Sequence, residues 1–304
     1  MSIKNKKIVG KVSPEGFRCK HRHNGNSHPR CYRRYLAGKQ ENTLKLPKIL
    51  IFDIETSPLK AYIWASNMWG INVNEGQVLS EWFMLTWSAK WLFDPKVLSD
   101  RLTGREAKNE DDSRIVKNLW NLLNEADVVI AHNGDRFDVP NMNTRFIVNG
   151  LPPTAPYQTI DTVRVARKQF GFTHNNLNAL ARVFGFESKV ETNFQLWKDC
   201  VNGDERALRE MEVYNNEDVR LLEEVYLKIR PWIHSHPNLG LYVDAVEPVC
   251  SNCLSVNLDK TDKFYYTPTG RYELYRCECG AYVRVRSSSV PKDKRKDLVV
   301  SVAR

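Results

Sequence analysis

The sequence predicts an α/β fold in which a mixed sheet is flanked by helices. Short apolar runs at residues 49–52 and 127–131 are typical of buried strands. Apolar residues at helical spacing predict a helix over 113–123, and a long helical stretch covers 204–232. Because strands and helices alternate along the chain, we expect a layered α/β domain.

The other expected elements fit between these landmarks. Two extended stretches rich in aromatic and β-branched residues follow the first strand, at 61–66 and 82–89. The remaining expected elements are a helix at 137–148, a strand at 158–161 and helices at 162–170 and 175–184.

Composition is typical of a soluble globular protein. The 304 residues are 42% hydrophobic and 27% charged. No run approaches the roughly 18 apolar residues of a membrane span, and the first residues lack the apolar core of a signal peptide. We therefore expect no membrane partner and a cytoplasmic location, which for a phage- or mobile-element-encoded protein is the host cytosol.

Charge is distributed unevenly and suggests three parts. Residues 1–48 hold 13 Lys/Arg against two Asp/Glu, and residues 284–304 hold seven against two, so the rest of the chain is net acidic at −7. An acidic body with basic ends is expected to collect cations and to meet polyanions. We predict a basic arm at 1–46, a catalytic domain at 47–236, and a small module with a basic tail at 237–304.

Four acidic residues form the main candidate site. Asp53 and Glu55 end the first apolar strand, where alternation points both to one face and Ile54 to the other. Asp138 follows the strand at 127–131 in a Gly-containing turn, where α/β sites form, although it could equally cap a helix. Tyr214 and Asp218 lie four residues apart and share a face of the long helix. Each acid alone has an ordinary surface explanation, whereas the set of four is specific.

This arrangement, a strand with DxE, a turn with NxxxFD and a helix with YxxxD, resembles the DEDD exonucleases, the DnaQ-like branch of the ribonuclease-H-like superfamily. The resemblance covers roughly residues 47–235. Tyr214 indicates the DEDDy subgroup, because the other subgroup would have a histidine where this chain has Val213. The likeness extends to the exonuclease domains of family B DNA polymerases.

The resemblance implies a 3′→5′ exonuclease that uses two Mg²⁺ or Mn²⁺ ions. Two such ions can activate water and stabilise charge on the phosphate, and hard cations prefer carboxylate oxygens. By analogy, Asp53 bridges both ions, Glu55 and Asp218 complete one site, and Asp138 serves the second. Tyr214 orients the attacking water. The expected contacts to the terminal nucleotide are made by Thr56, Asn133 and Phe137.

Seven cysteines indicate zinc rather than disulfides. Cys250 and Cys253 precede a second pair, Cys277 and Cys279, with an aromatic, extended segment between the pairs. This spacing predicts a zinc ribbon with four thiolate ligands, although the second pair is one residue shorter than the usual CxxC. The tyrosines and arginines of this module could contact nucleic acid or could fill a thin core.

The basic arm holds a second candidate zinc site. Five residues compete for four ligand places, surrounded by Lys and Arg: Cys19, His21, His23, His28 and Cys31. A phosphate-binding knuckle is the natural interpretation. An endonuclease site made from the histidines is an alternative.

Together these features predict a hydrolase that releases nucleoside 5′-monophosphates from the 3′ end of single-stranded DNA. One alternative is a non-catalytic nucleic-acid-binding protein, but such a protein would be expected to have lost a carboxylate. Another is an exoribonuclease, because two-metal chemistry is indifferent to the 2′-hydroxyl. The resemblance to family B polymerases favours DNA over RNA, and protein partners are not predicted.

Overall fold

The computed structural model describes residues 46–64, 72–187, 192–245 and 247–302. Residues 47–304 form one compact unit. The expected N-terminal arm falls almost wholly outside the described residues. The predicted boundary at residue 237 stays a prediction.

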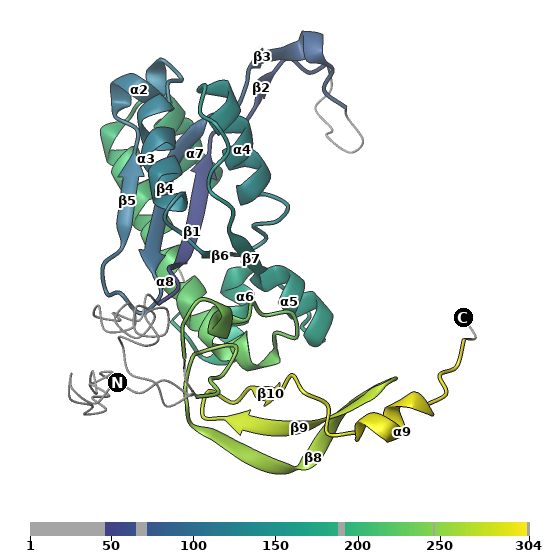
Figure 1. The fold of residues 1–304 in the computed structure, drawn as a ribbon. Coiled ribbons are helices and arrows are strands. Elements are labelled where there is room, and N and C mark those ends of the chain that lie inside the picture. The colour runs from purple at the N-terminus through teal and green to yellow at the C-terminus, as the bar shows by residue number, and fades with distance from the viewer. Residues whose placement is uncertain (1–45, 65–71, 188–191, 246, 303–304) are drawn as a thin grey trace, which may run out of the picture. The chain divides into compact units, whose positions relative to one another are not determined.

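The centre of the protein is a five-stranded mixed sheet in the order β5-β4-β1-β6-β7 (Figure 1). Its strands are β1 (Ile49–Thr56), β4 (Met84–Trp91), β5 (Leu98–Arg101), β6 (Val128–Ala131) and β7 (Gln158–Asp161). β1 pairs parallel with β6, which pairs parallel with β7, whereas β4 runs antiparallel to both β1 and β5. The carboxyl ends of the three parallel strands therefore meet at one edge of the sheet, and the predicted mixed α/β fold is confirmed.

Helices cover this sheet. They are α2 (Gly104–Lys108), α3 (Ser113–Leu123), α4 (Asp138–Val148), α5 (Thr162–Gln169), α6 (Leu177–Phe184), α7 (Phe194–Val201) and α8 (Glu205–Ile229). The helices predicted at 113–123, 162–170 and 204–232 agree with α3, α5 and α8 to within a few residues. β5, α2 and α7 were not predicted.

Alternation along β1 separates two buried cores. Leu50, Phe52 and Ile54 pack in one core with residues of α3 and α4. Ile49 and Ile51 pack in the other with Val219, Leu222 and Tyr226 of α8. Because side chains alternate along a strand, Asp53 and Glu55 continue the second row and point to the α8 side of the sheet.

Three polar contacts fasten α8 to β4 and β5. Ser88 donates to Asn216 over 2.9 Å, Ser99 donates to Glu212 over 2.7 Å, and the ammonium of buried Lys90 pairs with Glu223. Positions 212, 216 and 223 share one face of the helix, since they differ by four and seven residues. This polar row fixes the rotation of α8 and hence the direction in which Asp218 points.

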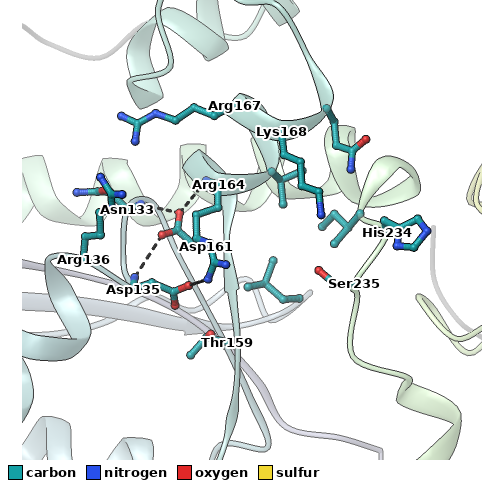
Figure 2. A pocket seen from close by; sticks show the side chains of 14 residues that line it. Asn133, Asp135, Arg136, Thr159, Asp161, Arg164, Arg167, Lys168, His234 and Ser235 are labelled. Carbon is teal, nitrogen blue, oxygen red and sulfur yellow. Dashed lines mark hydrogen bonds and ion pairs between the residues drawn. The ribbon is translucent and has the colours of Figure 1, made fainter. Parts of the chain in front are cut away.

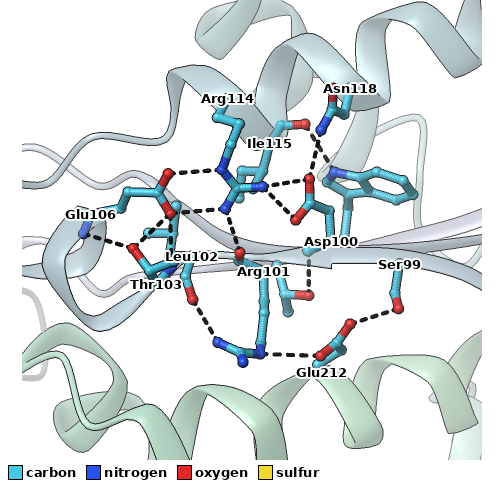
Figure 3. A network of polar contacts seen from close by, with 12 residues as sticks. Ser99, Asp100, Arg101, Leu102, Thr103, Glu106, Arg114, Ile115, Asn118 and Glu212 are labelled. Atoms are coloured by element: carbon cyan, nitrogen blue, oxygen red, sulfur yellow. Dashed lines mark hydrogen bonds and ion pairs between the residues drawn. The ribbon is translucent and has the colours of Figure 1, made fainter.

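A denser polar network holds the edge strand β5 against α3 (Figure 3). Arg114 donates to both carboxylate oxygens of Asp100, at 2.7 and 2.8 Å, and to both of Glu106, each at 2.8 Å. The bond from Arg114 is the largest cause that lowers the pKa of Glu106 to about 2. Arg101 extends the network to Glu205 and Glu212 of α8. Ionic contacts therefore secure a strand whose own sequence, LSDR, contains only one apolar residue.

The C-terminal part forms a second, three-stranded sheet in the order β10-β9-β8. Its strands are β8 (Leu258–Thr267), β9 (Gly270–Cys277) and β10 (Tyr282–Arg284), and the short helix α9 (Lys292–Lys296) follows. β2 (Lys60–Ala61) and β3 (Val78–Ser80) make a separate two-stranded ribbon. Across the described segments, no helix combines the length and apolar character needed to cross a membrane.

Candidate active site

Three of the predicted acids meet where β1 faces α8. Carboxylate oxygens of Asp53, Glu55 and Asp218 all lie within 4.8 Å of one another. Asp218 is 8% exposed, and the two acids of β1 are half-buried. Three negative charges this close repel one another unless a cation lies among them. Such a group of hard oxygen donors can hold Mg²⁺ or Mn²⁺.

Asn215 ties this group together from the helix side. Its side-chain amide donates to Asp53 Oδ2 over 2.6 Å, and the residue is fully buried. Ser88, directly opposite Asp53 on β4, bonds the next residue of α8, Asn216. Asn215 was not predicted from the sequence, although it lies between Tyr214 and Asp218 on the same helix, because its partner is 162 residues away along the chain.

Asp138 contacts the backbone of β1 between two of these acids. It begins α4, and its Oδ1 accepts a bond from the amide of Ile54, the residue between Asp53 and Glu55, over 3.3 Å. It is not among the three mutually close carboxylates. Burial, at 1% exposure, is the largest cause that raises its pKa to about 7. Asp138 lies in the first turn of α4, one residue after the N-cap position, which Phe137 occupies.

Tyr214 lies one helical turn before Asp218. Its ring is half-buried against the main core and meets Trp197 of α7 edge-on, with ring centroids 6.2 Å apart. α7 therefore supports the tyrosine from behind, which fixes its ring relative to the acids.

The three predicted nucleotide contacts fall around this edge of the sheet. Thr56 ends β1 at an irregularity of the β1–β4 ladder, and Phe137 immediately precedes Asp138 with 41% of its surface exposed. Asn133 has a positive φ of 72° in the loop after β6. An exposed ring beside buried carboxylates can stack on a base.

Asp161, at the end of β7, holds the loop that leads to Asp138. Its carboxylate caps α5 by accepting from the amides of Val163 and Arg164, at 2.9 and 3.2 Å. It also accepts from the amides of Asn133 and Asp135, at 3.1 and 3.3 Å. One side chain thus fixes two segments, a role that the sequence analysis did not assign.

His132 packs behind the same loop. One ring nitrogen lies 2.8 Å from the hydroxyl of Thr162, and the other lies 3.0 Å from the carbonyl oxygen of Asn175. Burial lowers its pKa to about 4. The ring is therefore neutral near pH 7, and the nitrogen that faces Asn175 carries the hydrogen and donates to its carbonyl.

Comparison with known proteins identifies the superfamily of most of the domain in which this edge of the five-stranded sheet lies. Residues 96–230 match the RNase_H superfamily. These residues form part of a ribonuclease-H-like domain. The match includes Asp138, Tyr214 and Asp218 but begins after β1, and the structure supplies β1 as the middle strand of the same sheet.

Two further similarities concern DNA polymerases. The chain is 24% identical over 147 residues to the PolC-type DNA polymerase III of Ureaplasma parvum serovar 3, a match that covers 47% of this chain and 10% of that protein. The structure of the family B DNA polymerase from Pyrobaculum calidifontis is similar with a TM-score of 0.45 and 18% identity, covering 61% of this chain and 25% of that one. The chain thus corresponds to a small part of each polymerase.

A basic cavity of about 390 Å³ lies along β7 in the ribonuclease-H-like domain (Figure 2). Its cationic lining residues are Arg136, Arg164, Arg167 and Lys168, and His234 also lines it. Arg164 pairs with Asp135, and in the described ranges no ion pair is recorded for Arg167 or Lys168. Asn133 also lines the cavity, so positive charge borders the loop that leads to Asp138.

The four C-terminal cysteines lie together beyond the ribonuclease-H-like domain. Ligand atoms of Cys250, Cys253, Cys277 and Cys279 lie within 4.8 Å of one another. Two Sγ–Sγ separations are 3.5 Å, for Cys253 and Cys277, and 3.9 Å, for Cys250 and Cys279, so the sulfurs are close but not bonded.

Backbone turns bring these sulfurs together, and the thiols influence one another's protonation. Each cysteine pair ends in a left-handed residue, Leu254 with φ of 64° and Gly280 with φ of 90°. The contact with Cys253 lowers the pKa of Cys250, whereas the same contact raises that of Cys253. Four cysteine sulfurs gathered in this way could hold a metal ion, since a closed tetrahedral site forms when such cysteines bind as thiolates. The second candidate zinc site, with Cys19, His21, His23, His28 and Cys31, lies outside the described residues.

Proposed function

We propose that this protein is a 3′→5′ exonuclease of the DEDDy type that removes nucleoside 5′-monophosphates from single-stranded DNA. One observation carries the proposal: the close approach of the Asp53, Glu55 and Asp218 carboxylates inside a ribonuclease-H-like domain. A surface cluster of acids would not normally be placed by a buried strand and a fastened helix together.

The residues fit two divalent cations. Asp53, Glu55 and Asp218 would hold them on the α8 side, and Asp138 would complete the set from α4. Asp138 is nearly inaccessible, and burial raises its pKa; a bound cation would offset the cost of burying its negative charge. When bound, the ions would supply an activated water and stabilise charge on the phosphate.

The chain's own residues position the reactants. Tyr214 would orient the attacking water through its hydroxyl, supported by Trp197. Asn215 would hold Asp53 in one orientation. Thr56, Asn133 and Phe137 would contact the terminal nucleotide, and Asn133 also lines the basic cavity.

DNA is the favoured substrate because the matched relative is named as a DNA polymerase. An exoribonuclease would use the same acids, and a non-catalytic binding protein would need neither Asp218 nor divalent metal. A cytoplasmic setting, including the cytosol of an infected host, suits the proposed reduced zinc thiolates.

The test is incubation of the full chain with Mg²⁺ or Mn²⁺ and 5′-labelled single-stranded DNA, beside an Asp218→Ala variant. A metal-dependent ladder of labelled products that shorten stepwise, absent from the variant, is expected. A labelled mononucleotide as the first product would show that the enzyme degrades DNA from the 5′ end instead. Matched RNA tests the sugar preference, and cleavage of circular DNA would indicate an endonuclease. Intact DNA in every lane, with binding retained, would overturn the enzyme proposal.

Asn215 offers a prediction about the site's geometry. We expect Asn215→Ala to weaken Mn²⁺ binding and to lower the hydrolysis rate, each by roughly 10- to 100-fold, because groups that orient metal ligands have effects of that size. Calorimetry and initial rates measure the two quantities. Glu217→Gln is the control, since Glu217 lies on the same helix but is exposed and pairs with Arg220. Equal effects of the two variants would refute the positioning role.

We also propose structural zinc at the four C-terminal cysteines. Purified protein is expected to contain one zinc ion per chain from this site, and Cys277→Ser is expected to lower the content by that ion and to unfold the three-stranded sheet. Elemental analysis and limited proteolysis measure these effects. Cys200→Ala is the control, because Cys200 is buried in the main core away from the cluster. Unchanged zinc in Cys277→Ser would contradict the assignment.

A further inference from the structure

One face of the β8–β10 sheet carries a row of tyrosine and arginine side chains. The strand register pairs Tyr265 with Tyr272 and Tyr282 with Arg276. Arg284 pairs with Leu274, which lies on the same side of β9 as Tyr272 and Arg276, because alternate residues share a face. We call this set the Tyr–Arg face: Tyr265, Tyr272, Arg276, Tyr282 and Arg284.

On the Tyr–Arg face, arginine guanidinium groups lie over tyrosine rings. The Arg284 guanidinium lies over the rings of Tyr272 and Tyr265, at 4.1 and 5.4 Å from their centroids, and that of Arg276 lies 5.9 Å from the ring of Tyr282. These contacts hold the planar groups in fixed orientations. A guanidinium plane that rests on a ring can still offer its other side to a base.

The Tyr–Arg face is not the core of its module. The opposite face carries Leu258, Val283 and Cys277, which pack with the cysteine cluster. Tyr265 and Tyr282 are instead 40% and 60% exposed. Tyr265 and Tyr282 therefore do not fill the core of this thin module, which was the alternative to nucleic-acid contact.

Charge on the Tyr–Arg face is mainly positive. The ion pair between Lys260 and Glu273 belongs to the opposite face. Asp259 is the acid that the register places on the Tyr–Arg face, opposite Arg276. Within the described residues no ion pair is recorded for Arg276 or Arg284. Both guanidinium groups are thus available to an anion.

We propose that the Tyr–Arg face binds single-stranded nucleic acid, with unpaired bases stacked on its rings and guanidinium planes and phosphates contacting its arginines. Stacking requires base faces that a duplex hides, so the face selects single strands. A polyanion complements the two arginines. This inference rests on the proposed function, because the bound strand would be the substrate of the exonuclease. The Tyr–Arg face would hold that strand at a surface separate from the carboxylates.

Equilibrium binding separates this proposal from the question of hydrolysis. Fluorescence anisotropy would follow a labelled single-stranded DNA on the full chain carrying Asp218→Ala, without added divalent cation or chelator, so that the proposed zinc stays. Tyr265→Ala and Tyr282→Ala are each expected to raise Kd about 5- to 150-fold, the range for one stacked base. Tyr282→Phe should bind as the parent protein does.

Tyr266→Ala is the matched control. Tyr266 is 66% exposed and adjacent to Tyr265 on β8, but the register places it on the opposite face, across from Arg271. The Tyr266→Ala variant should bind single-stranded DNA with an unchanged Kd. Duplex DNA of the same sequence should compete poorly.

Salt dependence tests the arginines. Replacing Arg276 and Arg284 by alanine should make the slope of log affinity against log salt shallower by about 1.4, or about 0.7 for each lost phosphate contact on a single strand. Unchanged zinc content and circular dichroism would show that each variant is folded.

If the Tyr265→Ala, Tyr282→Ala and Tyr266→Ala variants bound DNA equally well, the proposal would be overturned. The same result would be expected if the face bound a protein instead of nucleic acid. Tighter binding of duplex than of single strands would also overturn it. If hydrolysis were never observed but these affinities behaved as expected, the proposed nuclease would fail while the binding face would stand.

Discussion

Asp53→Asn is expected to lower the rate of DNA hydrolysis by at least about a thousandfold. Asp53 would contact both cations, and the loss of several kcal/mol of charge stabilisation corresponds to a factor of this size. Asparagine keeps the shape and can still accept the 2.6 Å bond from Asn215, so folding should be unaffected. Single-turnover rates at saturating Mg²⁺ measure the effect.

The matched control is Glu217→Gln, which removes an acid next to Asp218 on α8. Glu217 is exposed and pairs with Arg220 one turn away, at 3.3 Å. Its loss should change the rate less than twofold. If Asp53→Asn kept a rate within fivefold of the natural protein, the role of Asp53 as a metal ligand would be wrong.

Asp112→Ala is expected to cause the largest loss of stability, about 3–5 kcal/mol. Asp112 is 1% exposed and accepts two bonds from Arg145, at 2.6 and 2.7 Å, one from the Met84 amide at 2.8 Å and one from Asn149 at 3.1 Å. Removing it leaves a nearly buried guanidinium without its counter-charge. Thermal unfolding should shift down by roughly 6–20 °C.

The neighbouring residue provides the comparison for that measurement. Asp111 is exposed, and its carboxylate accepts from the Ser113 amide over 3.1 Å. Asp111→Ala should therefore cost about 1 kcal/mol at most. Similar losses in the two variants would show that the buried pair of Asp112 and Arg145 does not stabilise the junction of β4, α3 and α4.

Much of the fold could be predicted because local pattern and tertiary environment agree. The apolar residues in the run of β1 and most of those at helical spacing in α3 are buried in the structure, as their patterns predict. α7 was missed, although Asn193 caps it and Leu196 and Cys200 give it a buried face. β5 could not be predicted in the same way, because the partners that stabilise it come from elsewhere in the chain, such as Arg114.

The candidate site was predictable to the extent that it depends on local geometry. Alternation along β1 was enough to place Asp53 and Glu55 on one face. Asn215 and Asp161 were not assigned because their roles depend on bonds to distant segments. The Tyr–Arg face depends on strand register, which a bulge between Lys260 and Phe264 shifts. Such a shift cannot be derived from alternation alone.

The measurement that tests the central claim most directly is anomalous diffraction from crystals soaked with Mn²⁺ and a nucleoside 5′-monophosphate. We predict two manganese peaks among Asp53, Glu55, Asp138 and Asp218, with the phosphate against them. Crystals of Asp53→Asn should lose at least one peak. Absence of manganese at these carboxylates, in crystals whose nucleotide is nevertheless bound, would contradict the two-metal account.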